Sequence, residues 1–142
     1  MNLHDTLPEW SVAITPTLVV STAIATRDFQ DVHHDRDLAQ SHGSKDIFLN
    51  ILTSTGLVER YVTDWAGPAT EVRGISIRLG APAYPYDTLT FSGEVTSIEG
   101  GVAVISVTGA VSLGSHITGT VKVLVVEPSD AGVRVETSGT AR

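Results

Sequence analysis

The stretch DIFLNILTSTGLVERYVTDWAGP, residues 46–68, decides the fold. Apolar residues recur in it at three- and four-residue steps, which predicts a helix with one apolar face. Leu49 and Leu57 widen that face, so we expect the rest of the chain to surround this helix. Gly67 and Pro68 end it. The recurring residues are Phe48, Ile51, Leu52, Thr55, Val58 and Val62.

Downstream of the helix, residues 71–127 alternate between apolar and polar side chains, which predicts antiparallel strands. Turn residues interrupt the alternation at positions 82–87, 99–101 and 114–115. One long helix followed by four strands predicts an α+β fold in which an antiparallel sheet wraps around the helix. The edges of such a sheet invite pairing with a second chain.

Upstream of the helix the patterns are weaker. We predict a loosely held arm over residues 1–8 and a short strand over 9–14. Residues 17–26 fit either a strand, because they are rich in β-branched side chains, or a helix that starts with Thr15 as cap and Pro16. A short helical turn is predicted over residues 35–41, with its stop at Gly43.

Length and composition fit one domain, for which we expect residues 16–127 after an N-terminal arm and strand over 1–15. Residues 128–142 are small and polar, which predicts a disordered tail. The net charge of -7 argues against a nucleic-acid partner, and the absence of cysteine excludes thiolate catalysis and disulfides. The chain shows neither a signal peptide nor a membrane-spanning stretch, so we expect a cytoplasmic protein without a membrane partner.

The loop RDFQDVHHD, residues 27–35, carries the densest set of titratable groups. A bend between Asp28 and His33 would let a carboxylate and an imidazole converge on one water molecule, which is a sensible acid–base pair. Two other readings stay open. Asp28 and Arg27 fit an ion pair among solvated histidines, and a metal site would use Asp31, His33, His34 and Asp35.

This loop resembles the D-x-N-P-x-H-x-D motif of the MaoC-like hydratase family, with Asp28, His33 and Asp35 at the matching positions. A turn at residues 82–89 also resembles that family, with Tyr86 where glycine is usual. The resemblance implies a single hot-dog domain that hydrates a trans-2-enoyl-CoA. In such enzymes the Asp and His activate the water, and no cofactor is needed because CoA is part of the substrate.

Residues 25–37, together with 43–48 and 61–68, are similar to the small MaoC-like subunits of heteromeric enoyl-CoA hydratases that degrade steroid side chains in bacteria. This resemblance implies a cholesterol- or steroid-derived acyl-CoA substrate. It also implies a second MaoC-like subunit, in a heterodimer or heterotetramer. A link of that complex to a thiolase-like aldolase is a further expectation.

Two departures from the family pattern bear on the site. Gln30 and Asp31 stand where Asn and Pro are common, and Asn50 and Ile51 stand where a His-Gly pair often opens the central helix. The resemblance implies that the backbone amide of Ile51 holds the thioester oxygen, a role that survives a change of side chain. We expect substrate contacts from Gln30, Val32, Phe48, Asn50 and Ile51; Val32, Phe48 and also Leu52 fit the core as well as an acyl pocket.

Two alternative functions remain at this stage. A hot-dog acyl-CoA thioesterase would use a carboxylate of the central helix, for which Glu59 is the candidate. A non-catalytic acyl-CoA-binding subunit would not need the Asp28–His33 pair. Basic residues that could hold the CoA phosphates in any of these functions are Lys45, Arg60, Arg73 and Arg78.

Overall fold

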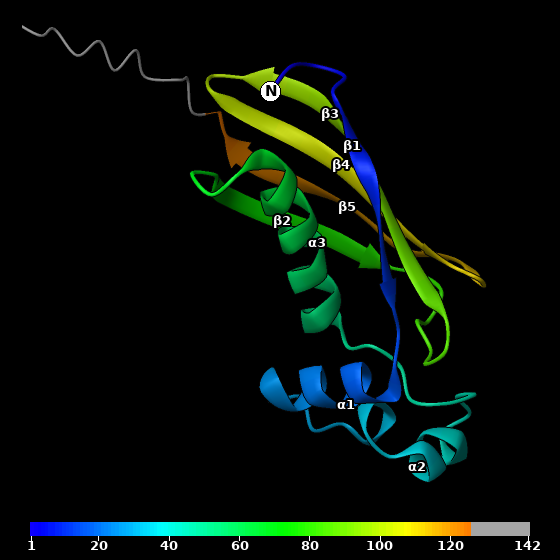
Figure 1. The fold of residues 1–142 in the computed structure, drawn as a ribbon. Coiled ribbons are helices and arrows are strands. Elements are labelled where there is room, and N and C mark those ends of the chain that lie inside the picture. The colour runs from blue at the N-terminus through cyan, green and yellow to red at the C-terminus, as the bar shows by residue number, and fades with distance from the viewer. Residues whose placement is uncertain (126–142) are drawn as a thin grey trace, which may run out of the picture.

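A long helix, α3, lies against one face of a five-stranded antiparallel sheet (Figure 1). The computed structural model describes residues 1–125. The strand order is β1-β3-β4-β5-β2, so β1 and β2 form the edges. The elements are β1 (Thr6–Ala13), α1 (Pro16–Ala25), the 3-10 turn η1 (Asp31–His33), α2 (Arg36–Ser41), α3 (Ile51–Ala66), β2 (Glu71–Leu79), β3 (Thr88–Glu99), β4 (Val102–Val111) and β5 (Gly114–Leu124).

The core lies between the sheet and α3. Alternate residues of β3, β4 and β5 face the helix and are fully buried, as the alternation of the sequence predicts. The predicted α+β architecture, with the four strands in the predicted order behind the helix, is therefore confirmed. These buried strand residues include Leu89, Phe91, Val95, Ala103, Ile105, Val107, Ile117, Val121 and Val123.

The buried face of α3 differs from the predicted one in its first turn. Val58 and Val62 are buried as expected, but Ile51 and Leu52 are 51% and 52% exposed. Thr53 and Ser54 are buried in their place, because both hydroxyls find hydrogen-bond partners inside the protein. The helix begins at Ile51 with Asn50 as its N-cap, where the family resemblance places its start, so Phe48 of the apolar pattern lies before it.

The N-terminal segment is held more firmly than predicted. β1 begins at Thr6, three residues before the predicted strand, and pairs with β3. The arm before it also bonds to β3, since the N–H of His4 donates to the carbonyl of Val95 at 2.9 Å. The ambiguous segment is the helix α1, whose Thr15 cap accepts a hydrogen bond from the N–H of Leu18 at 3.0 Å.

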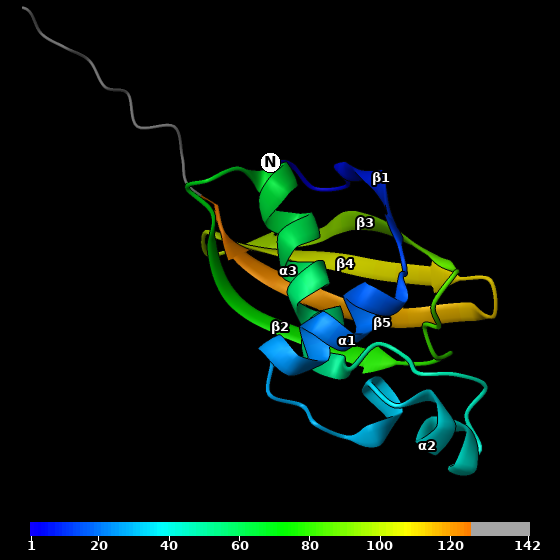
Figure 2. The ribbon, with the colours of Figure 1, turned by 60° about the horizontal axis from the view of Figure 1, so that its bottom comes forward.

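Helices α1 and α2 lie beyond the N-terminal end of α3, away from its Ala66 end (Figures 1 and 2). The loop between α1 and α2 therefore meets the start of α3, which is the arrangement that builds the site below. No helix among residues 1–125 is long and apolar enough to cross a membrane. The tail predicted over residues 128–142 lies outside the described residues.

The pairing of β2 with β5 requires glycine at position 119. A Cβ added there would collide with the backbone carbonyl of Ser76 and crowd Ile77 on the neighbouring strand. We expect Gly119→Ala to lower the free energy of unfolding by about 1–3 kcal/mol, measured by urea denaturation. Gly74→Ala on β2 is the control, because a Cβ at Gly74 meets no atom within 4 Å; equal losses in both variants would contradict the packing argument.

Candidate active site

The end of α1 determines where Asp28 lies. The N–H of Arg27 donates to the carbonyl of Ile24 at 3.0 Å, and the N–H of Asp28 donates to the carbonyl of Ala23 at 2.9 Å. This pair of bonds closes the helix around a residue in the left-handed conformation, a position that glycine usually takes. Here it is Arg27, with φ 56°. The turn directs the chain sharply out of the helix and leaves the Asp28 side chain facing the start of α3.

His33 lies in the turn η1 and is buried, and contacts with Phe48 set the orientation of its ring. Its Nδ1 donates a hydrogen bond to the carbonyl oxygen of Phe48 at 2.7 Å, and its ring packs edge-on against the Phe48 ring. A carbonyl can only accept, so Nδ1 carries the hydrogen and Nε2 of the neutral ring keeps a free lone pair. That Nε2 lies 3.4 Å from Oδ2 of Asp28. The predicted bend therefore does bring the two groups together.

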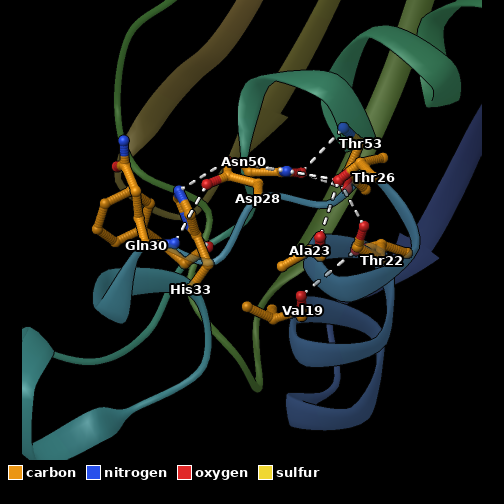
Figure 3. Close-up of polar contacts among 10 residues, drawn as sticks. Val19, Thr22, Ala23, Thr26, Asp28, Gln30, His33, Asn50 and Thr53 are labelled. Carbon is orange, nitrogen blue, oxygen red and sulfur yellow. Dashed lines mark hydrogen bonds and ion pairs between the residues drawn. The ribbon is translucent and has the colours of Figure 1, made fainter.

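Asn50 joins this pair to the helices on either side (Figure 3). Its Nδ2 donates to Oδ2 of Asp28 at 3.1 Å and to Oγ1 of Thr26 at 2.8 Å. Its Oδ1 accepts from the N–H of Thr53 at 3.0 Å, and also from the Thr53 hydroxyl. Asn50 is 2% exposed, so these contacts satisfy a side chain that water hardly reaches.

The start of α3 presents unpaired backbone donors beside this network. Among residues 1–125, the N–H groups of Ile51 and Leu52 have no hydrogen-bond acceptor in the protein, whereas that of Thr53 is capped. The positive end of the helix dipole lies at the same place and further favours a negatively charged oxygen there. With Asp28 21% exposed and His33 7% exposed at their side chains, the site is sheltered but still open to small molecules.

The remaining residues predicted to contact substrate lie close to this pair. The N–H of Gln30 donates to Oδ1 of Asp28 at 3.3 Å, while its side chain is exposed. Gln30 and Val32 line one surface pocket of about 430 Å³, together with Phe29, Asp31 and His42. Phe48 lies between His33 and the Tyr84 ring. Whether these side chains touch a substrate stays a prediction.

The other groups considered from the sequence lie apart from the pair. His34 is exposed, and Asp35 caps α2 by accepting from the N–H of Leu38 at 3.0 Å. In residues 1–125 no three His, Cys, Asp or Glu side chains are arranged to hold a metal ion. Glu59 is exposed on α3, and Arg78 on β2.

One of the four basic residues, Lys45, is connected to the site through aromatic side chains. Its Nζ is 5.8 Å from the centre of the Tyr84 ring, which in turn contacts Phe48. Two of the others contact different side chains: Arg60 lies over the Trp10 ring, and Arg73 pairs with Glu71 at 3.1 Å.

A second buried polar pair was missed from the sequence. Ser54 and His116 are 0% and 2% exposed, and Ser54 Oγ lies 2.9 Å from Nε2 of His116. The other ring nitrogen, Nδ1, donates to the carbonyl of Ala81 at 2.6 Å, so Nε2 accepts from the Ser54 hydroxyl. The sequence indicated the burial of Ser54 only by its spacing, because Ser54 lies four residues before the buried Val58 and so on the same helix face. This pair fixes the first turn of α3 against β5.

Comparison with known proteins identifies the family of this chain. A family model described as a MaoC-like domain matches residues 4–117. The chain belongs to the MaoC-like family. It is 61% identical, over 82% of its length and 90% of the relative's, to the 3-oxo-4,17-pregnadiene-20-carboxyl-CoA hydratase beta subunit of Mycobacterium tuberculosis.

Solved structures place this MaoC-like chain among hot-dog proteins. A crystal structure of the ChsH1-ChsH2 complex from Mycobacterium tuberculosis matches with a TM-score of 0.85 and 58% identity, covering 87% of this chain and 97% of the other. The (R)-hydratase from A. caviae involved in PHA biosynthesis matches with a TM-score of 0.80 at 18% identity, covering 89% and 98%. The second likeness shows the fold alone. The predicted hot-dog fold and the predicted family are both confirmed.

Burial of His116 predicts a pH dependence of stability. Burial lowers the pKa of His116 below its ordinary 6.5, although its hydrogen bond to Ala81 acts in the opposite direction. The unfolded chain therefore takes up this proton more readily, so the contribution is fully present above pH 6.5 and is lost as the pH falls below it. In urea denaturation between pH 7.5 and 5, His116→Gln should flatten that decline. The exposed His42→Gln should leave it unchanged, and an unaltered slope in both variants would contradict the assignment.

The left-handed residue before Asp28 predicts a second effect on stability. Because Arg27 has φ 56°, glycine should relieve strain there, and Arg27→Gly should raise the free energy of unfolding by up to about 1 kcal/mol. Arg27→Val should lower it by about 1–2 kcal/mol, since a β-branched side chain fits this conformation poorly. Guanidinium denaturation of both variants checks this, and a valine variant as stable as the glycine one would show that the turn is not strained.

Proposed function

We propose that this chain is the catalytic subunit of a heteromeric enoyl-CoA hydratase, which adds water across the 2,3 double bond of a trans-2-enoyl-CoA. The observation that carries the proposal is the pair of acceptors 3.4 Å apart, Nε2 of His33 and Oδ2 of Asp28. Two such acceptors suit one water molecule that donates a hydrogen bond to each. The hydrogen bond from His33 to Phe48 supports this, because it leaves Nε2 free to accept.

In the proposed reaction, the pair removes one proton from the bound water while the water oxygen attacks the β-carbon of the thioester. The electrons of the double bond move towards the carbonyl, which becomes an enolate. The N–H of Ile51, unpaired among residues 1–125, is the proposed donor to that oxygen, helped by the helix dipole. The proton held by the pair then passes to the α-carbon, so the net change is the addition of one water.

This reaction needs no cofactor, since water and the thioester supply every atom that moves. Apolar side chains beside the pair are open to an acyl group: Phe29 is 66% exposed, and Ile51 and Leu52 are about half exposed. We infer a steroid side-chain-derived acyl-CoA because the relative at 61% identity is named for a pregnadiene-carboxyl-CoA. A cytoplasmic location belongs to the same proposal.

We also propose a second MaoC-like subunit as partner, in a heterodimer or heterotetramer. The support is that the relative is named a beta subunit and that the matching solved structure is a two-component complex. The exposed apolar side chains around the pair are consistent with a surface that another chain or the acyl group covers. A thiolase-like aldolase linked to that complex stays an expectation.

Replacing each member of the pair tests the proposal. Asp28→Asn and His33→Gln should each lower kcat for hydration by about a hundredfold or more, because general acid–base catalysis contributes that much. Activity is followed by the loss of enoyl-thioester absorbance, with the partner subunit present. Matched controls are Asp37→Asn and His34→Gln, which make the same chemical changes at exposed positions close by in the sequence.

Near-full activity in both pair variants would refute the assignment. Release of free CoA, measured with a thiol reagent, would instead indicate the thioesterase alternative through Glu59, whose exposure on α3 does not favour it. A chain that binds acyl-CoA but shows neither activity, alone or with its partner, would be a non-catalytic subunit.

A further inference from the structure

The side chain of Asn50 has no hydrogen-bonding capacity left for a substrate. Its amide nitrogen has two hydrogens, and these go to Thr26 Oγ1 and to Asp28 Oδ2. Its oxygen accepts from the backbone and the hydroxyl of Thr53. The partners also settle which end is nitrogen, because the backbone N–H of Thr53 can only donate and so must face the oxygen. The side chain of Asn50 therefore holds Thr26, Asp28 and Thr53 in place.

Thr26 gives this network its direction (Figure 3). Its hydroxyl lies 2.7 Å from the carbonyl of Thr22 and 3.1 Å from that of Ala23, and each of these carbonyls also accepts a backbone N–H, from Thr26 and Asp28 respectively. The hydroxyl hydrogen is thus committed to the helix, and the oxygen must accept from Asn50. The bonds run in one sense, from the Asn50 amide to the Thr26 hydroxyl and on to the backbone of α1.

The carboxylate of Asp28 is consequently held at both oxygens. Oδ1 accepts from the N–H of Gln30 at 3.3 Å, and Oδ2 accepts from Asn50 at 3.1 Å. Two donors on different oxygens restrict rotation of the carboxylate about its last bond. Oδ2 is also the oxygen that faces Nε2 of His33, so the donor that Thr26 anchors is bound to the oxygen nearest the imidazole.

We propose that Thr26, acting through Asn50, is a positioning residue that holds the Asp28 carboxylate at the angle needed for the shared water. This rests on the proposed hydratase function. Thr26 touches neither Asp28 nor His33 in any hydrogen bond of the described chain, so its effect passes through the Asn50 amide. Because the group moved is the base and not the thioester's binding surface, the effect belongs on kcat and not on KM.

The test uses Thr26→Val, which keeps the shape of the side chain and removes the hydroxyl, in the complex with the partner subunit. We expect kcat for hydration to fall about tenfold while KM stays within about twofold, since small misplacements of a catalytic group are costly. Thr26→Ser restores the hydroxyl and should return kcat to within about threefold of wild type.

Thr22→Val is the matched control. Thr22 lies one turn earlier on the same helix, is also half-buried, and donates the equivalent hydrogen bond to the carbonyl of Leu18 at 2.6 Å. Its side chain makes no hydrogen bond to Asn50 in the described chain. Loss of kcat that is equal in the Thr22 and Thr26 valine variants, or a loss confined to KM, would overturn the proposal.

A second measurement separates this proposal from the proposed function. In the wild-type chain the two Nδ2 hydrogens of Asn50 should exchange slowly with water in NMR, and the Asp28 carboxyl carbon should give one sharp signal. Thr26→Val should speed that exchange and shift the Asp28 signal, whereas Thr22→Val should change neither. If the wild-type complex does not hydrate enoyl-CoA but these shifts occur, the hydratase function fails and the positioning role stands; if the shifts are absent, the positioning role is wrong.

Discussion

The hydrogen bonds of the Asn50 side chain connect three parts of the chain that are far apart in sequence. Its oxygen caps α3. Its nitrogen donates to the hydroxyl of Thr26, at the end of α1, and to the carboxylate of Asp28, which follows the turn out of α1. Burial makes each bond matter, because a polar group left unpaired at 2% exposure would cost on the order of 1–3 kcal/mol. The orientation of α3 and the position of Asp28 therefore depend on one another.

The first turn of α3 follows a different rule from the rest of the helix. Val58 and Val62 hold the later turns by apolar packing, whereas Thr53 and Ser54 hold the first by hydrogen bonds to Asn50 and His116. Hydrogen bonds are directional and packing is not, so the polar turn fixes both the place and the rotation of the helix start. That precision suits the end of the helix whose free amides face the site, and it leaves Ile51 and Leu52 exposed there.

Two non-glycine residues with positive φ lie in the loops around the site, Arg27 at 56° and Tyr86 at 71°. A third, His4 at 67°, lies on the N-terminal arm beside β3. Arg27 precedes Asp28, and the Tyr86 loop carries Tyr84 against Phe48. The Tyr86 backbone is held by its N–H donating to the carbonyl of Ile14 at 2.7 Å, and that loop is also braced by Asp87. Hydrogen bonds from Ser112 keep the pKa of Asp87 below its usual range, which is the mark of a carboxylate held in place.

Much of this structure could be read from the sequence, because local patterns encode it. The four strands, the central helix and the Asp28–His33 spacing all rest on periodicity or on a short motif, and neither needs distant contacts. The start of the helix did not follow its apolar pattern. Ile51 and Leu52 fit a buried face by spacing alone, and only the partners supplied by His116 and Asn50 made the polar residues the better ones to bury.

The roles of Thr26 and Asn50 were decided by the tertiary structure. Thr26 looked like part of an ambiguous β-branched segment, and Asn50 looked like a substitution at a substrate-binding position. Their meaning comes from a hydrogen bond between residues 24 positions apart, and from another that joins Asn50 to Asp28 across 22 positions. A sequence determines which groups can donate and accept; the packing of α1 against the start of α3 determines which of them meet.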